Sequence, residues 1–174
     1  MKTVRLVHGY NVNDGGLDTI GRLINPLKLM DYNPVMFVYG LIGLLSALFW
    51  NKKRAKKLKR ITQPDDILIG HSNGCTIIAR AIEQGLNNQH IIFIHPALDK
   101  GWTPPKSFTG TIYVYHSEND MATELASWIP LVMWGDMGGG GATSGHPAFV
   151  NYDGGYKHSD GFKKDPDLYI ETLK

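Results

Sequence analysis

The chain has 174 residues, of which 43% are hydrophobic and 20% are charged, and its formal net charge is +2. This composition excludes a disordered or fibrous chain and is typical of a globular protein, and the length predicts a single domain over residues 1–174. The one cysteine, Cys75, excludes an internal disulfide. Because no export signal precedes the first apolar run, we expect a cytoplasmic protein.

The positive charge is concentrated in one segment. Residues 51–60 carry seven of the 18 Lys and Arg residues and no acid, so the rest of the chain has a net charge of −5. The 16 apolar or small residues just before it, Val35 to Trp50, resemble a membrane span with a basic flank. As a helix, however, they reach only about 24 Å, and the hydrocarbon core is about 30 Å thick. We therefore expect a buried strand followed by a core helix.

The first part of the chain alternates β-rich runs with helical patterns. Residues 3–7 predict a strand that ends at His8, and apolar residues between positions 17 and 27 recur at helical spacing. A second strand is predicted at residues 35–39. A long helix is predicted from Leu41 to about Ile61, apolar in its first half and basic in its second.

The same alternation continues to the end of the chain. The predicted strands are residues 67–69, 91–94, 111–115 and 148–150, and the predicted helices are residues 76–82, 122–129 and 166–173. The stretch from residue 134 to 161 is glycine-rich and is expected to be mostly loop. Asp165 is expected to cap the last helix, with Pro166 at its first position.

Strands that alternate with helices predict a three-layer α/β/α fold with a mostly parallel sheet of about five to six strands. In such sheets ligands bind beyond the carboxyl ends of the strands. The four polar residues that follow predicted strands should therefore lie along one edge: His8, Ser72, His95 and Asp120.

The pentapeptide Gly70-His71-Ser72-Asn73-Gly74 lies between a predicted strand and a predicted helix. In that context G-x-S-x-G is typical of a nucleophile elbow, in which a strained turn lifts the serine hydroxyl out of the sheet. Ser72 could instead be a turn serine that caps the helix. Cys75, at the start of the same helix, is a second nucleophile candidate, although most free cysteines are buried and inert.

A serine nucleophile needs a general base and a carboxylate that orients this base. On this topology the residues follow in the order Ser, Asp or Glu, His, and Asp120 and His158 satisfy that order. His146 in the same glycine-rich stretch competes with His158. Asp99 and Glu118 compete with Asp120.

Four segments together resemble landmarks of the α/β-hydrolase superfamily, particularly its small esterase- and lipase-like members without a lid. They are His8-Gly9-Tyr10-Asn11, the elbow pentapeptide, His116-Ser117-Glu118-Asn119-Asp120 and His158-Ser159-Asp160-Gly161-Phe162. The resemblance implies that Ser72 is the nucleophile, His158 the base and Asp120 the acid. It also implies an oxyanion hole formed by the backbone N–H groups of Tyr10 and Asn73.

Three further residues are candidates for substrate contact. They are His8, Asn11 and His71, and their alternative roles are to shape the oxyanion loop or to pack the elbow. Four histidines at strand ends (His8, His71, His95 and His116) could in principle bind zinc. No pair has the spacing of a helical metal motif, so we expect no metal. A serine hydrolase of the expected kind also uses no organic cofactor.

These features predict a serine hydrolase that cleaves a small carboxylic ester through an acyl-enzyme on Ser72. The alternative is a non-catalytic module of the same fold that uses the apolar and basic helix 41–61 for binding. That helix could be a solvated surface or could contact an anionic membrane surface. Because the basic run lacks interleaved aromatic residues and the rest of the chain is acidic, we expect no nucleic-acid partner.

Overall fold

Six parallel strands form one continuous sheet in the computed structural model, which describes residues 1–9, 14, 16–39, 44–120 and 135–174. The strand order is β2-β1-β3-β4-β5-β6, and every neighbouring pair is parallel. The predicted parallel sheet is therefore confirmed. The strands are β1 (Thr3–Val7), β2 (Asn33–Phe37), β3 (Ile67–His71), β4 (His90–Ile94), β5 (Thr111–His116) and β6 (Phe149–Asp153).

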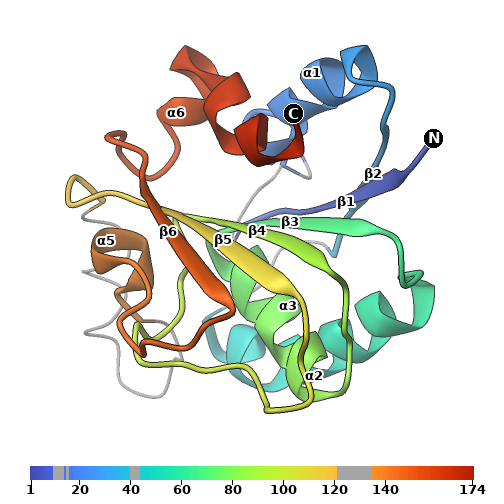
Figure 1. Ribbon diagram of the computed structural model, residues 1–174, viewed down its shortest axis with the longest axis vertical. Helices are drawn as coiled ribbons and strands as arrows, with labels where there is room; N and C mark the ends of the chain where they lie inside the picture. Colours follow the sequence, from blue (N-terminus) through green and yellow to red (C-terminus); the bar gives the residue numbers. More distant parts are fainter. Residues whose placement is uncertain (10–13, 15, 40–43, 121–134) are drawn as a thin grey trace.

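Helices cover both faces of this sheet (Figure 1). One face carries α1 (Ile24–Leu29) and α6 (Gly161–Lys164), and the other carries α2 (Leu44–Ile61), α3 (Asn73–Glu83) and α5 (Met137–Gly140). Two 3-10 helices complete the described elements: η1 (Ile20–Leu23) and η2 (Pro166–Leu173). The three-layer α/β/α architecture is confirmed.

The central strands are buried on both sides because side chains alternate between the two faces of a strand. In β3, Leu68 belongs to the core on the α2 and α3 side, and Ile69 belongs to the core on the opposite side. In β4, Phe93 and Ile92 divide in the same way. This two-sided burial explains why both strands appear in the sequence as continuous apolar runs.

Helix α2 has the amphipathic character that its sequence predicts. Ala55 and Leu58 are buried, whereas Lys56 and Lys57 are exposed, and the helix packs against α3. Within the described parts of the chain, every helix is too short or too polar to cross a membrane.

Three local predictions differ from the structure. The predicted helix at residues 17–27 is split into η1 and α1, and Pro26 lies in the first turn of α1, where the N–H that proline lacks would have no intrahelical partner. The last helix is a 3-10 helix, and the Asp165 side chain does not cap it. The glycine-rich stretch contains the short helix α5. The helix predicted at residues 122–129 lies outside the described residues.

Candidate functional site

Ser72 occupies a sharp turn between the end of β3 and the start of α3. Its backbone has φ 53° and ψ −121°, a conformation that a non-glycine residue adopts only under strain of about 1–3 kcal/mol. A Cβ atom at Gly74 would collide with the carbonyl oxygen of Val7, and one at Gly70 would lie 2.9 Å from the backbone nitrogen of Cys75. Both glycines of the pentapeptide are thus required by close backbone approaches. The Ser72 side chain makes no capping hydrogen bond to α3 as described, which excludes the helix-capping alternative.

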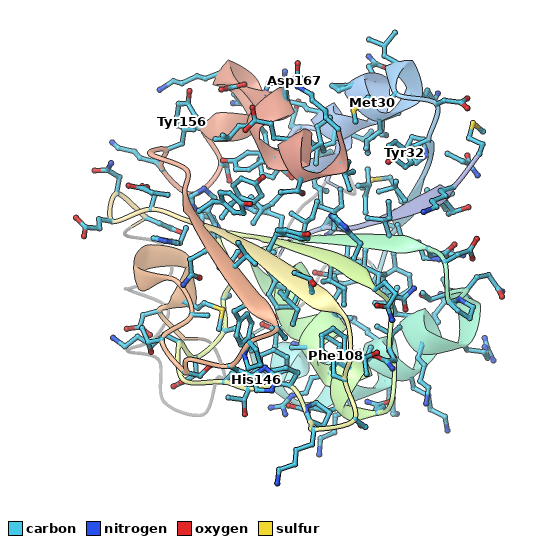
Figure 2. All side chains as sticks on the ribbon, in the orientation of Figure 1. Met30, Tyr32, Phe108, His146, Tyr156 and Asp167 are labelled. Carbon is cyan, nitrogen blue, oxygen red and sulfur yellow. The ribbon has the colours of Figure 1, made fainter. Side chains whose placement is uncertain are left out.

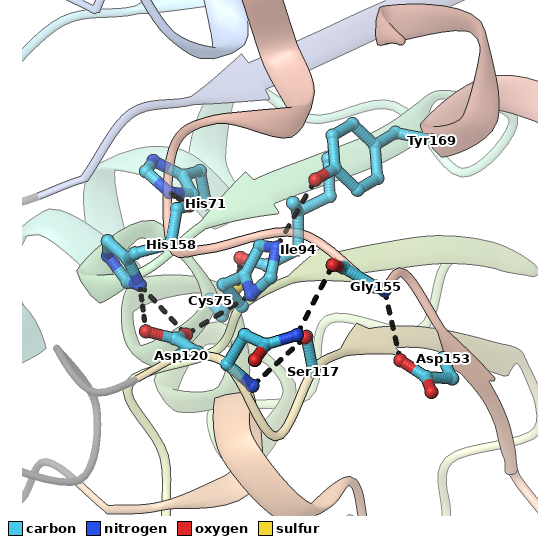
Figure 3. Close-up of polar contacts among 11 residues, drawn as sticks. His71, Cys75, Ile94, Ser117, Asp120, Asp153, Gly155, His158 and Tyr169 are labelled. Carbon is cyan, nitrogen blue, oxygen red and sulfur yellow. Dashed lines mark hydrogen bonds and ion pairs between the residues drawn. The ribbon is translucent and has the colours of Figure 1, made fainter. Parts of the chain in front are cut away.

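His158 and Asp120 meet at the carboxyl edge of the sheet. Nδ1 of His158 lies 2.9 Å from Oδ2 and 3.0 Å from Oδ1 of Asp120 (Figure 3). Asp120 is 1% exposed, whereas about a quarter of the His158 side chain remains accessible. Because the carboxylate only accepts, it fixes the tautomer of His158 with the proton on Nδ1, so that Nε2 is left as the basic nitrogen.

A hydrogen bond from His71 links His158 to the elbow. Nε2 of His71 donates to the backbone oxygen of His158 at 3.0 Å, and the two imidazole centroids are 4.8 Å apart. Phe162 packs edge-on against the His71 ring. The His158 backbone is therefore held against the residue that immediately precedes Ser72. His71 itself is buried, and this bond favours a positional role over substrate contact.

The Asp120 carboxylate is negatively charged despite its burial. Burial alone would raise the pKa of Asp120, but hydrogen bonds from His158 and His95 outweigh it and hold the pKa far below its ordinary value. By contrast, burial raises the pKa of the Cys75 thiol. Cys75 thus lacks the thiolate character that a nucleophilic cysteine needs.

The competing residues have other local contacts. Nδ1 of His146 accepts from the backbone N–H of Ala148 at 3.2 Å, and Figure 2 places His146 on the same side of the sheet as Phe108. Oδ1 of Asp99 accepts from the N–H of Gly101 at 2.7 Å. Glu118 is exposed. In the described part of the chain, no hydrogen bond joins any of these three side chains to Asp120 or His158.

The other side of the elbow is held by a buried polar network. The Asn73 side chain accepts from Asn51 Nδ2 at 2.9 Å and donates to the Tyr39 hydroxyl at 3.3 Å. The Tyr39 hydroxyl in turn lies 2.6 Å and 2.8 Å from the backbone oxygens of His8 and Gly9. The network therefore ties the first residue of α3 to the loop that follows β1. The oxyanion candidate Tyr10 and the substrate candidate Asn11 lie outside the described residues.

His8 is enclosed by the same network. Its ring stacks on Tyr39 with centroids 3.9 Å apart, its Nδ1 donates to the Gly9 oxygen at 2.8 Å, and its Nε2 accepts from the Tyr39 N–H at 3.3 Å. Both ring nitrogens are thus used within the chain. This geometry favours a role in shaping the loop over direct contact with substrate.

The sequence predicts no catalytic role for His95 or Tyr169, which are linked to Asp120 by hydrogen bonds. His95 Nδ1 lies 3.1 Å from Asp120 Oδ2, and His95 Nε2 lies 3.2 Å from the Tyr169 hydroxyl. The strand-end position of His95 was an available signal, whereas nothing in the sequence near Tyr169 points to the site. Among the described residues, one ligand atom each of His95, Asp120 and His158 lies within 4.8 Å of the others, so these three could hold a divalent metal. Hydrogen bonding already accounts for the arrangement of all three side chains.

The burial of His71 makes the stability of the fold depend on pH. Burial, and then the electrostatic influence of the neighbouring His158 and His95 imidazoles, hold the pKa of His71 well below 6.5. An unfolded histidine titrates near 6.5, so below that pH the unfolded chain binds more protons than the folded chain and stability is lost as pH falls. One such group contributes a slope of up to about 1.4 kcal/mol per pH unit.

We therefore expect the free energy of unfolding, measured by urea titration, to fall less between pH 7 and pH 5 in His71→Gln than in the unmodified protein. Glutamine can still donate to the His158 oxygen but does not titrate. His146→Gln, which removes an imidazole on the other side of the sheet, is the control and should retain the original slope. Burial also lowers the pKa of His8, His90 and His95, and these contribute equally in all three proteins. Equal slopes for the unmodified protein and His71→Gln would contradict this account.

Comparisons with known proteins place this geometry in a known fold. No protein-family model and no curated protein sequence matches the chain. Among solved structures, it is similar to the ydeN gene product of B. subtilis, with 17% identity, a TM-score of 0.65, and 99% of this chain and 97% of that chain covered. The Pyrococcus furiosus esterase Pf2001 aligns with 13% identity, a TM-score of 0.64 and coverage of 99% and 80%.

A third similar structure is an extracellular alpha/beta-hydrolase from a Paenibacillus species, with 14% identity, a TM-score of 0.61 and coverage of 99% and 98%. These alignments span nearly the whole of this chain. Together with the parallel six-stranded sheet and the strained turn at Ser72, they show that the chain has the α/β-hydrolase fold.

Proposed function

We propose that this protein is a serine hydrolase that cleaves carboxylic esters of small molecules through an acyl-enzyme on Ser72. One observation carries the proposal: the residue that precedes the strained Ser72 holds His158, and His158 donates to the buried Asp120 carboxylate. In this proposal they act as the nucleophile, the base and the orienting acid that acyl transfer requires. The name of the similar Pyrococcus furiosus protein, an esterase, supports the choice of an ester.

In the proposed reaction, Nε2 of His158 takes the proton from the Ser72 hydroxyl as Oγ attacks the ester carbonyl carbon. The resulting imidazolium keeps its Nδ1–H on Asp120, which offsets the new positive charge. His158 then donates the proton to the departing alkoxide oxygen, and the alcohol leaves an acyl group on Ser72. A water molecule, deprotonated by His158, attacks the acyl carbon; the bond to Oγ then breaks, His158 returns the proton to Oγ, and the carboxylic acid leaves. All steps use groups of this chain and require no cofactor.

The negative charge of each tetrahedral intermediate needs nearby hydrogen-bond donors. Asn73 is the first residue of α3 and directly follows Ser72, and in a nucleophile elbow the backbone N–H of the residue after the nucleophile points at the oxyanion. We assign its backbone N–H, together with that of Tyr10, to the oxyanion hole. The bonds from Asn73 through Tyr39 to the backbone of His8 and Gly9 support this assignment, because they hold the two sides of such a hole together.

Replacement of the nucleophile gives the first test. Ser72→Ala should lose labelling by a fluorophosphonate probe and reduce kcat/KM for p-nitrophenyl butyrate by at least ~10³-fold, because no other group replaces the attacking oxygen. Ser107→Ala, which removes an exposed serine hydroxyl elsewhere, is the control and should behave like the unmodified protein. Labelling that persists unchanged in Ser72→Ala would rule out the proposal.

Paired substitutions test the base and the acid. His158→Gln and Asp120→Asn should each lower kcat by about 10³- to 10⁴-fold, since the first removes the base and the second favours the wrong tautomer of His158. The competing residues provide matched controls: His146→Gln and Asp99→Asn should change kcat by less than about twofold, a factor worth about 0.4 kcal/mol. A larger loss in either control than in its counterpart would reassign that role.

A second candidate function is non-catalytic binding through the basic surface of α2. Six exposed cations lie along this helix: Lys52, Lys53, Lys56, Lys57, Lys59 and Arg60. Such a surface favours contact with anionic lipid headgroups, at about 1 kcal/mol for each Lys or Arg near the membrane surface. In this alternative the fold serves as a non-catalytic module that associates with membranes.

Vesicle binding tests that alternative. It predicts binding to phosphatidylserine-containing vesicles that weakens as salt is raised and is lost when Lys52, Lys53, Lys56 and Lys57 are changed to Gln, because the attraction is screened within a Debye length. Phosphatidylcholine vesicles and a Lys163→Gln variant, altered outside α2, are the controls. Salt-independent binding, or equal binding to both kinds of vesicle, would count against it. Hydrolysis of a short-chain ester would exclude the non-catalytic version.

A further inference from the structure

His95 and Tyr169 form a hydrogen-bonded chain behind Asp120 that the reaction above does not use. Nδ1 of His95 contacts the same carboxylate oxygen, Oδ2, that lies 2.9 Å from Nδ1 of His158, and the Tyr169 hydroxyl contacts the far nitrogen of the His95 ring. We propose that His95, held by Tyr169, is a positioning residue that fixes the Asp120 carboxylate and, through it, the orientation of His158. This inference rests on the proposed function.

The protonation states of Tyr169, His95 and Asp120 determine which group donates each of the hydrogen bonds that join them. The ionised Asp120 carboxylate only accepts, so Nδ1 of His95 carries a proton and donates it. Burial lowers the pKa of His95, which keeps the ring neutral, so Nε2 has a lone pair that accepts. Burial raises the pKa of Tyr169, so its hydroxyl stays protonated and donates to that lone pair. Donor and acceptor therefore match from Tyr169 through His95 to Asp120.

The surrounding backbone is built to accommodate this chain. His95 has φ +44°, an uncommon conformation for a non-glycine residue, and its N–H is bonded to the Tyr115 oxygen at 2.8 Å. Its side chain is fully buried. A Cβ atom at position 161 would collide with the Tyr169 hydroxyl, so Gly161 leaves the space that the hydroxyl occupies.

The His95 imidazole restricts the rotation of the Asp120 carboxylate. Both carboxylate oxygens are within 3.0 Å of the His158 nitrogen, so that contact alone does not select one rotation of the carboxylate. A bond from His95 to Oδ2 selects one. Misplacement of a reacting group by about 1 Å can cost about 10²-fold in rate, so a fixed carboxylate would limit how far His158 departs from the orientation that the proposed proton transfer needs.

A pair of substitutions isolates this effect. Glycine and asparagine both tolerate a positive φ, but only asparagine offers an amide N–H near the position of Nδ1. In His95→Gly we expect kcat for p-nitrophenyl butyrate, and the rate of fluorophosphonate labelling, to fall about 10²-fold with KM unchanged. His95→Asn should restore most of both rates. Rates are expressed per folded molecule, so a merely structural role would leave them equal in the two variants.

The pH profile gives a second readout. Without the His95 donor, the negative charge of Asp120 acts more strongly on the proton that His158 takes up, so the acid limb of the labelling rate should move to higher pH in His95→Gly but not in His95→Asn. The other titratable groups that face the cluster are unchanged in both variants: His71 on β3, His116 on β5, and Tyr156 and Asp160 in the segment before α6. An unchanged acid limb in His95→Gly would contradict the proposal.

Tyr169→Phe removes only the outer end of the chain and should lower kcat by a smaller factor than His95→Gly. Tyr115→Phe, which removes the hydroxyl of a neighbouring buried tyrosine, is the matched control and should not change kcat.

Proton NMR gives a readout that needs no substrate: we expect two far-downfield imidazole N–H signals, one of which disappears in His95→Gly. Failure of the unmodified protein to be labelled would overturn the proposed function, whereas normal labelling with equal rates in His95→Gly and His95→Asn would overturn the positioning role alone.

Discussion

The close approach of α3 to the end of β1 is the constraint on which the site depends. At Gly74 the helix backbone lies so near the Val7 carbonyl oxygen that a side chain cannot fit, and Ser72 must adopt a positive φ to make the connection. The strain of that turn is offset by the surrounding sheet, since the Ser72 N–H bonds to the Ile94 oxygen and its carbonyl accepts from Cys75. Contacts with β1, β3 and β4 thus hold Ser72 at the carboxyl edge of the sheet, where ligands bind in parallel α/β folds.

A buried carboxylate is the second constraint, because an unpaired charge in a protein interior is costly. Asp120 meets this cost with two imidazole donors, and His158 and His95 occupy different positions around it. One of these rings is partly accessible and the other is fully enclosed. In the proposed mechanism, this asymmetry lets His158 exchange protons while His95 holds the carboxylate in place, so the bonds that offset the burial of the charge would also orient the base.

Much of the fold follows from local pattern, and the exceptions have physical causes. The apolar runs of β3 and β4 predict buried parallel strands because helices cover both faces of each strand. The pairing of Asp120 with His158 is consistent with chain order, but local sequence could not separate His158 from His146, since both lie in a glycine-rich stretch without periodicity. The contacts of Tyr39 and Tyr169 join residues more than 30 positions apart, and such tertiary contacts leave no trace in a local pattern.

The end of the chain completes the site as well as the fold. After β6 the chain returns over the sheet through α6 and η2, and this return brings His158 to Asp120 and Tyr169 to His95 (Figure 1). Phe162 and Tyr169 pack together in the core on that face and anchor the segment by apolar burial. The contacts that hold both imidazoles therefore depend on the packing of this segment, and in the proposed mechanism the base is in place only once the segment has packed. Hydrophobic burial on one face of the sheet therefore determines where the proposed catalytic groups lie at its edge.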